Sequence, residues 1–225
     1  MPVFRLTKAL VFPDPELAED GLLAIGGDLS EARLLLAYRS GIFPWFGEED
    51  PLLWWSPPER ALLRPGHLHL SARTRRSLRQ HPFKIRFDTA FEPVIGHCSQ
   101  VPRPGQDGTW ITPEMREAYV ALHRAGHAHS VEAWRDGELR GGLYGVSLGG
   151  AFFGESMFSL EPEASRAALQ ALDARLATWG FTMIDGQLPH EGLMGYGFQT
   201  VPRVLFLEEL AEALRQEGRT GSWSI

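Results

Sequence analysis

Helical periodicity of apolar residues is clearest in three segments of the chain. Residues 30–41, 112–126 and 162–180 place apolar side chains three or four positions apart, as a helix with one buried face does. Thr112 at the start of the second segment and Gly126 at its end are typical helix-capping residues. In the third segment we expect four positions to face inward: Ala168, Leu169, Leu172 and Leu176.

Strand patterns follow in the second half of the chain. Residues 128–134, 139–148 and 150–156 are joined by the short turns "RDGE" and "LGG", which predicts antiparallel hairpins. Residues 84–88 alternate as a strand does, and 181–187 reads as a buried strand that runs out into polar residues. Hairpins followed by a helix and another strand predict an α+β domain whose sheet is covered by helices.

The remaining segments are shorter. We expect helices at 70–80, capped by Ser71, and at 91–100, with a Pro/Gly loop at 101–110. Residues 22–25 predict a loop or short strand. Residues 48–65 are rich in proline and tryptophan, which predicts a rigid, packed connection with a domain boundary near its end.

Composition places the protein among soluble globular proteins. Of 225 residues, 44% are hydrophobic and 22% charged, and the single cysteine, Cys98, excludes an internal disulfide framework. We find no signal peptide and no apolar run of about 18 residues, so we expect a cytoplasmic protein without membrane spans.

Charge is distributed unevenly. The net charge is −6, yet residues 60–86 contain no Asp or Glu. The same stretch holds eight cations: Arg60, Arg64, Arg73, Arg75, Arg76, Arg79, Lys84 and Arg86. A local basic field in an acidic protein suits a polyanion that docks at one place, although a solvated helix face would have a similar composition.

Several residues are candidates for chemistry. Glu155 directly follows an apolar hairpin, where an ionised carboxylate needs a partner. Asp185 and Gln187 are two positions apart at the end of a buried strand, so the carboxylate could orient the amide, or the two could simply form a strand-end turn. Trp45, Trp54, Trp55 and Trp110 are either core residues or platforms for nucleobases.

Other chemistries have little support. The sequence lacks a phosphate-binding loop, and "AIGGDLS" reads as a turn and helix start. His97 and Cys98 are adjacent in sequence, so their side chains would point apart on a helix or a strand, which argues against a Cys/His nucleophilic pair. His127 and His129 could share a strand face, but no further ligands accompany them, and we expect no metal site.

The ordered motifs of this chain resemble one family. These are "GLLAIGGDLS" (21–30), "GIFPWF" (41–46), "LWWSPPERALL" (53–63), "GTWIT" (108–112), "GHAHSVEAW" (126–134), "GGLYGV" (141–146), "GESMFS" (154–159) and "IDGQ" (184–187). In order and spacing they are similar to bacterial leucyl/phenylalanyl-tRNA–protein transferases. The resemblance runs from about Phe12 to Arg203.

The resemblance implies a small N-terminal α/β domain, residues 1–62, and a GNAT-like acyltransferase domain, residues 63–225, with a mixed, largely antiparallel sheet. It implies an enzyme that moves leucine or phenylalanine, less often methionine, from aminoacyl-tRNA to the α-amine of proteins that begin with Arg or Lys. The product would carry an N-terminal degradation signal. The resemblance also implies a monomer. No cofactor is expected, because an aminoacyl ester is already activated for aminolysis.

Site residues follow from the matched motifs. The catalytic positions are Glu155, Asp185 and Gln187, with Gln187 oriented by Asp185 to contact the attacking amine. Glu155 would hold the amino group of the bound aminoacyl moiety, and Asp185 or Glu155 the acceptor's basic side chain.

The apolar pocket for the aminoacyl side chain comprises Leu143, Phe152, Met157, Leu172, Leu176 and Ile184. Residues near the terminal adenosine are Trp45, Trp110 and Tyr119. The tRNA backbone would contact Arg73, Arg75, Arg76, Arg79, Lys84 and Arg86.

Departures from the family pattern are local. After Gln187 the usual pattern remains only as "GLMGYG" (192–197), and Leu172 and Leu176 replace phenylalanines of some relatives. Two rival functions are an acetyl-CoA-dependent N-acetyltransferase and a noncatalytic RNA-binding module. The sequence lacks the coenzyme A-binding loop that an N-acetyltransferase needs. An RNA-binding module would leave the apolar pocket and the polar residues Glu155, Asp185 and Gln187 unexplained.

Overall fold

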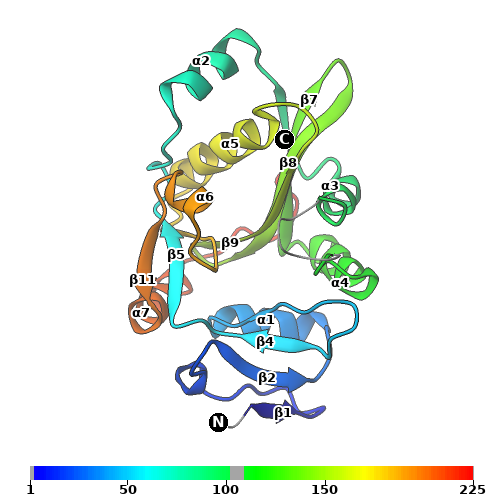
Figure 1. Ribbon diagram of the computed structural model, residues 1–225, viewed down its shortest axis with the longest axis vertical. Coiled ribbons are helices and arrows are strands. Elements are labelled where there is room, and N and C mark those ends of the chain that lie inside the picture. Colours follow the sequence, from blue (N-terminus) through cyan, green and yellow to red (C-terminus); the bar gives the residue numbers. More distant parts are fainter. Residues whose placement is uncertain (1–2, 102–108, 225) are drawn as a thin grey trace.

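The computed structural model describes residues 3–101 and 109–224 and contains two sheets (Figure 1). The smaller sheet has the strand order β1-β2-β4-β3, in which β1 and β2 are parallel and the other pairs antiparallel. Its strands are β1 (Phe4–Leu6), β2 (Leu22–Gly26), β3 (Phe43–Pro44) and β4 (Leu53–Trp55). A short 3-10 helix, η1 (Pro15–Leu17), precedes β2.

The larger sheet has the strand order β11-β5-β10-β9-β8-β7-β6. Its strands are β5 (Glu59–Leu63), β6 (Lys84–Phe87), β7 (Ala128–Arg135), β8 (Glu138–Leu148), β9 (Ala151–Ser159), β10 (Met183–Asp185) and β11 (Gln199–Pro202). Neighbouring strands are antiparallel except β9 and β10, which are parallel. The chain crosses between these two strands through helix α5 (Ala164–Thr178).

Helices cover both faces of the larger sheet. Helix α5 lies on one face, while α3 (Phe91–Cys98) and α4 (Pro113–Arg124) lie on the other (Figure 1). Strand alternation sorts the side chains accordingly, because successive residues point to opposite faces. Leu143 and Phe152 pack in the cluster beneath α5, whereas Tyr144 and Phe153 pack on the α3 and α4 side. The remaining helices are α2 (Ala72–Gln80), α6 (Glu191–Met194) and α7 (Arg203–Ala213).

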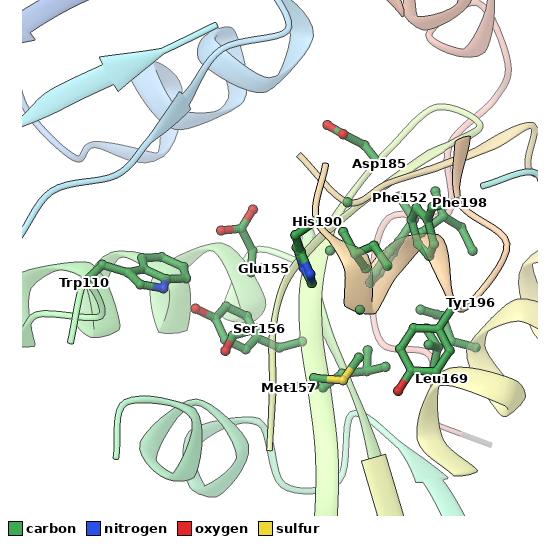
Figure 2. Close-up of a pocket in the computed structure, with 18 residues that line it drawn as sticks. Trp110, Phe152, Glu155, Ser156, Met157, Leu169, Asp185, His190, Tyr196 and Phe198 are labelled. Carbon is green, nitrogen blue, oxygen red and sulfur yellow. The ribbon is translucent and has the colours of Figure 1, made fainter. Parts of the chain in front are cut away.

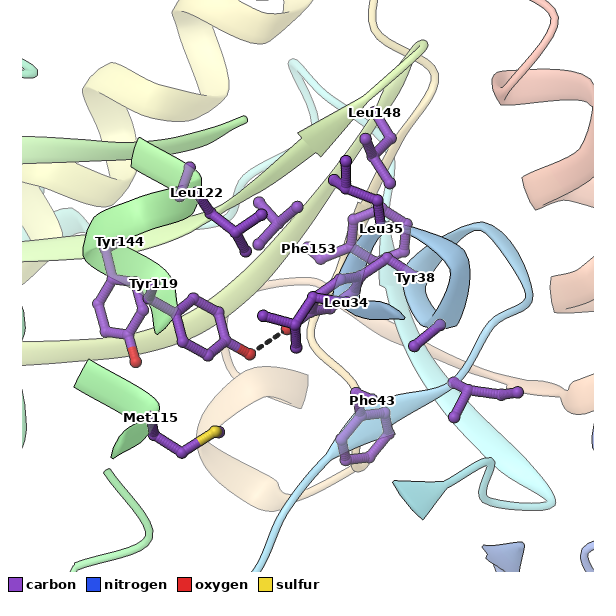
Figure 3. Close-up of a cluster of buried hydrophobic side chains, with 14 of the residues drawn as sticks. Leu34, Leu35, Tyr38, Phe43, Met115, Tyr119, Leu122, Tyr144, Leu148 and Phe153 are labelled. Carbon is purple, nitrogen blue, oxygen red and sulfur yellow. Dashed lines mark hydrogen bonds between the residues drawn. The ribbon is translucent and has the colours of Figure 1, made fainter. Parts of the chain in front are cut away.

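Helix α1 (Glu31–Arg39) joins the two sheets. Ser30 caps its start, with Oγ accepting from the Arg33 N–H at 3.4 Å, and Gly41 takes a left-handed φ of 71° just beyond its end. Leu34 and Tyr38 of α1 belong to one continuous apolar cluster with side chains of the larger sheet and of α4 (Figure 3). The two sheets therefore share a core.

The expected elements between 84 and 187 are confirmed as helices or strands at the expected places, and the α+β class is confirmed. The interpretation of 48–65 as a connection is wrong, because this segment contains β4 and β5. Both strands are too short to show alternation, and Pro57 and Pro58 between them carry the turn chemistry that dominated the pattern. Strand β11 and helix α7 were not expected from the sequence.

Two further expectations concern organisation. Strand β5 crosses the expected boundary between 62 and 63 and pairs within the larger sheet, while the division into 1–62 and 63–225 stays a prediction. The loop expected at 101–110 lies mostly outside the described residues. Among residues 3–101 and 109–224, no helix is long and apolar enough to cross a membrane.

Candidate active site

A cavity of about 420 Å³ opens between β8, β9, β10 and α5, and the segment around α6 forms its remaining wall (Figure 2). Apolar side chains make up most of its lining: Leu143, Phe152, Met157, Leu169, Leu172, Ile184, Leu193 and Phe198. Trp110, Glu155, Asp185 and His190 also line it. The cavity is thus an apolar chamber with a polar rim, the common form of a small-molecule site.

A β-bulge in β9 places the rim carboxylate. Tyr144 pairs with Ser156 and Gly145 with Gly154, so Glu155 has no partner on β8. The extra residue changes the phase of the strand. Phe152 and Met157, five positions apart, consequently line the same cavity, although regular alternation would send them to opposite faces.

Glu155 receives three hydrogen bonds from the protein itself. Tyr38 Oη donates to Oε1 at 2.7 Å, Tyr119 Oη donates to Oε2 at 3.1 Å, and Gln187 Nε2 donates to Oε1 at 2.8 Å. Burial nevertheless outweighs these donors and raises the pKa of Glu155 to about 7. The carboxyl can therefore exchange a proton near neutral pH.

Asp185 is neutralised by a buried arginine. Its carboxylate contacts Arg60, with Nε donating to Oδ1 at 3.3 Å and Nη2 to Oδ2, and the two residues are 0% and 1% exposed. Arg60 also donates to the Gly41 carbonyl at 2.7 Å and lies over the rings of Phe43 and Phe206. The expectation that Arg60 belongs to the basic surface is wrong, because its charge is used inside the protein.

Gln187 is held by both acids, but in different ways. Asp185 Oδ1 accepts the backbone N–H of Gln187 at 2.8 Å, and the residue adopts a left-handed φ of 61°. Glu155 holds the side-chain amide. The expectation that Asp185 orients this amide directly is therefore wrong; Asp185 fixes the backbone. With Nε2 donating to Glu155, the side-chain oxygen Oε1 of Gln187 can accept a hydrogen bond from a ligand.

Comparison with known proteins identifies the family. The model described as "Leucyl/phenylalanyl-tRNA protein transferase" matches residues 62–211, and the model of its N-terminal domain matches residues 27–58. The chain belongs to this family. A leucyl/phenylalanyl-tRNA–protein transferase of Myxococcus xanthus (strain DK1622) is 53% identical over 227 residues, covering 100% of this chain and 97% of the relative. One from Nitratidesulfovibrio vulgaris (strain DP4) is 52% identical over 218 residues, covering 96% and 93%. The protein is thus an enzyme, an aminoacyltransferase.

The structure brings together most of the residues expected for the pocket of this leucyl/phenylalanyl-tRNA protein transferase family member. Leu143, Phe152, Met157, Leu172 and Ile184 line the cavity. Leu176 does not, because it lies one turn further along α5, fully buried among the side chains beneath that helix. Whether the lining residues contact an aminoacyl group stays a prediction.

The three aromatic residues expected near the terminal adenosine are separated. Trp110 lines the cavity, whereas Trp45 is 36% exposed and packs against Trp55 with ring centroids 5.6 Å apart. Tyr119 is fully buried beside Tyr38, and the two hydroxyls are hydrogen-bonded (Figure 3). Tyr119 therefore supports Glu155 from behind and presents no face to a base.

The remaining lining residues were missed by sequence reasoning. Leu169 was expected only as an inward residue of α5. His190, Leu193, Tyr196 and Phe198 come from the segment after Gln187, which reaches the cavity because β11 pairs with β5. Only the "GLMGYG" motif drew attention to this segment, and nothing in the motif indicated that its side chains would line a cavity beside α5.

The residues expected to contact tRNA are exposed. Arg73, Arg75, Arg76 and Arg79 lie on α2, and Lys84 and Arg86 on the edge strand β6. Within the described ranges 3–101 and 109–224, no set of His, Cys, Asp or Glu residues is grouped for metal binding. His129 instead pairs with Asp88, Nδ1 to Oδ2 at 2.9 Å.

The raised pKa of Glu155 predicts that the difference in stability between the unmodified protein and Glu155→Gln depends on pH. Its folded pKa of about 7 exceeds the unfolded value of about 4.3, so the folded state binds the proton more tightly. The free energy of unfolding therefore falls as pH rises from about 4.5 to about 7, by up to about 1.4 kcal/mol per pH unit. In Glu155→Gln this contribution is absent. Urea unfolding of both proteins across this range should give a difference that grows with pH, and parallel curves would contradict the assignment.

Proposed function

We propose that this enzyme transfers leucine or phenylalanine, and less often methionine, from aminoacyl-tRNA to the α-amine of proteins that begin with Arg or Lys. The product would carry an N-terminal degradation signal. The observation that supports this best is the apolar cavity with Glu155 at its rim, where the Glu155 carboxylate is hydrogen-bonded to the Gln187 side chain. A cavity of about 420 Å³ can hold one large apolar side chain, and the carbonyl of the bound aminoacyl group would then lie toward the polar rim.

The reaction is aminolysis of an ester, which requires alignment more than activation. A neutral amine attacks the ester carbonyl, the C–N bond forms as the C–O bond to the ribose breaks, and the amine proton leaves for the ribose oxygen or water. Holding the two reactants in place can lower the barrier by several kcal/mol. The reaction requires neither ATP nor a metal, because the amide product is more stable than the ester.

Gln187 is the residue proposed to position the attacking amine. Its side-chain Oε1 would accept an N–H of that amine, since its Nε2 already donates to Glu155. An amide is too weak a base to remove the proton outright. The left-handed backbone of Gln187, held by Asp185, supports this role because it fixes where the side chain starts.

Glu155 is proposed to hold the amino group of the bound aminoacyl moiety. A pKa near 7 lets the carboxyl pair with an ammonium or share a proton with it. Asp185 is a poor partner for the acceptor's Arg or Lys side chain, because Arg60 already neutralises it. Glu155 remains the candidate for that contact too.

Further features are proposals that rest on the family membership. The larger sheet would be GNAT-like, consistent with antiparallel β7, β8 and β9, the α5 crossover and the parallel β10. Trp45 and Trp110 would lie near the terminal adenosine. The enzyme would act as a cytoplasmic monomer.

The exposed arginines of α2 predict salt-dependent tRNA binding. Each phosphate contact contributes roughly one unit to the slope of log affinity against log salt concentration. Arg76→Glu with Arg79→Glu should therefore flatten the slope by about two units. Fluorescence anisotropy with labelled tRNA over a salt series measures it, and Arg215→Glu, exposed beyond the end of α7, is the matched control. A slope unchanged in the double variant would move the tRNA surface elsewhere.

The deciding experiment follows labelled leucine from leucyl-tRNA. The acceptor is a protein beginning with Arg, and the control is the same protein beginning with Ala, without ATP or coenzyme A. Incorporation into the first protein alone supports both donor and acceptor. Binding of tRNA without transfer would favour an RNA-binding module, and transfer from acetyl-CoA instead would favour an acetyltransferase.

A further inference from the structure

Phe152 lies at the floor of the cavity and has little freedom toward the sheet. The side chain is fully buried and lines the chamber on the α5 face of β9. A Cβ placed on Gly145 of β8 would lie 2.5 Å from Phe152 Cζ, so the ring rests directly on the Gly145 backbone. The sheet therefore blocks movement of the ring in that direction, and its position depends on what packs behind it.

Trp223 is one of the side chains behind Phe152. The two ring centroids are 5.9 Å apart with an interplanar angle of 38°, and Trp223 is 4% exposed without lining the cavity itself. The same buried cluster contains Trp223, Phe152 and the apolar residues of the cavity wall. A chain segment distant from the reacting groups thus reaches the back of the pocket.

Several contacts hold the Trp223 ring in one orientation. It stacks on His129 with centroids 3.7 Å apart and planes within 6°, and it meets the edge of Trp179 at 5.0 Å. The Trp223 backbone N–H donates to Asp88 Oδ2 at 2.7 Å, and Nε1 donates to the Arg219 carbonyl at 3.1 Å. Asp88 also pairs with His129, so the ring and its support belong to one hydrogen-bonded unit.

We propose that Trp223 determines the depth of the aminoacyl pocket by holding Phe152 in place, and so helps to set which donor side chain is preferred. The residue is a positioning residue, since it acts only through Phe152. The inference rests on the proposed function of the cavity. It adds a determinant outside the cavity wall, in a segment that the family model covering residues 62–211 does not reach.

Trp223 acts by filling the space behind the Phe152 ring. Without the indole, Phe152 can tilt away from the chamber, because side chains around a void relax partly into it. The chamber then becomes deeper at its apolar end. Longer or larger donor side chains gain contact area relative to leucine, while Glu155 at the rim keeps its hydrogen bond to Gln187.

Trp223→Leu is the variant that tests this, with donor selectivity as the readout. The ratio of kcat/KM for phenylalanyl-tRNA to that for leucyl-tRNA should rise about tenfold, within the range of about 10- to 200-fold that one methylene is worth in an apolar pocket. Trp223→Phe, which retains an aromatic ring behind Phe152, should return the ratio toward that of the unmodified protein. A fall in activity with an unchanged ratio would mean that Trp223 is only structural and would overturn the proposal.

Trp54→Leu is the matched control. Trp54 is also buried, and its Nε1 also donates to a backbone carbonyl, that of Gly26 at 2.9 Å, but it lies in the smaller sheet and does not line the cavity. The same substitution there should lower stability without changing the donor ratio. In a Phe152→Ala background, Trp223→Leu should no longer change the ratio, because the two residues act as one unit. An undiminished effect in that background would exclude Phe152 as the intermediary.

A binding measurement separates this inference from the proposed reaction. Leucine and phenylalanine joined by stable amide bonds to 3′-amino-3′-deoxyadenosine cannot be transferred, and calorimetry gives their relative affinities directly. A ratio shifted by Trp223→Leu, with no transfer to protein in any variant, would support the pocket inference and remove the proposed reaction. An unshifted affinity ratio, or no binding of either compound to the unmodified protein, would overturn the inference.

Discussion

Replacement of Gln187 by alanine is expected to lower kcat about 100- to 1,000-fold, the usual effect of removing one preorganised polar contact to the reacting atoms. Affinity for aminoacyl-tRNA should change by no more than about twofold, because the contact is made with the attacking amine. Alanine is informative here because Gln187 has a φ of 61°. Both residues carry a Cβ, so the backbone strain stays similar and the variant reports on the amide alone.

Single-turnover transfer and equilibrium tRNA binding measure the two quantities separately. Gln199→Ala, an exposed glutamine on β11, is the matched control and should leave both unchanged. Glu155→Gln adds a second test, since it retains the size of the side chain and one acceptor oxygen but removes the negative charge beside the Gln187 N–H. An equal loss of turnover and tRNA affinity in Gln187→Ala would refute the positioning role.

Arg60→Ala is expected to lower the free energy of unfolding by about 3–5 kcal/mol, because it leaves the Asp185 carboxylate buried without its partner. The expectation rests on geometry: both residues are almost completely buried, and Arg60 also donates to the Gly41 carbonyl at 2.7 Å. The substitution further removes the cation–π contacts of the guanidinium with the rings of Phe43 and Phe206. The Asp185 carboxylate should then move, and the backbone of Gln187 with it.

Arg64→Ala supplies the comparison for this stability loss. Arg64 pairs with Glu209 at 3.1 Å, but its side chain is 60% exposed, and exposed ion pairs contribute about 0–1 kcal/mol. Denaturant unfolding of the two variants should therefore differ by several kcal/mol. If Arg60→Ala lost no more stability than Arg64→Ala, the buried pair would not be the support for Asp185 that its geometry implies.

The site could be predicted in part because its residues occupy short, ordered motifs. "GESMFS" and "IDGQ" carry Glu155, Asp185 and Gln187, and five of the expected pocket residues line the cavity. Their mutual contacts were less predictable. Asp185 was expected beside the Gln187 amide, yet the bulge in β9 brings Glu155 to that amide instead. A bulge depends on the pairing of two strands, and one strand's sequence does not show it.

Residue type also misled where burial decided the role. Arg60 looked like part of a basic stretch, and Tyr119 like a residue beside a base, but both are buried, Arg60 against Asp185 and Tyr119 against Glu155. Nothing in the local pattern distinguishes an exposed arginine from a buried one. The distinction depends on Asp185, which lies 125 positions away in the chain.

The sequence by itself determined the family through its ordered motifs. It also determined the α+β class and the central helices and hairpins, because periodicity, caps and turns act over a few residues. The tertiary structure decided three other matters: the partners of Glu155, the neutralisation of Asp185 by Arg60, and the position of Trp223 behind the pocket. Each of these depends on contacts between residues brought together by sheet pairing and helix packing. Such contacts leave no local signal, since any side chain of suitable size and polarity would give the same pattern.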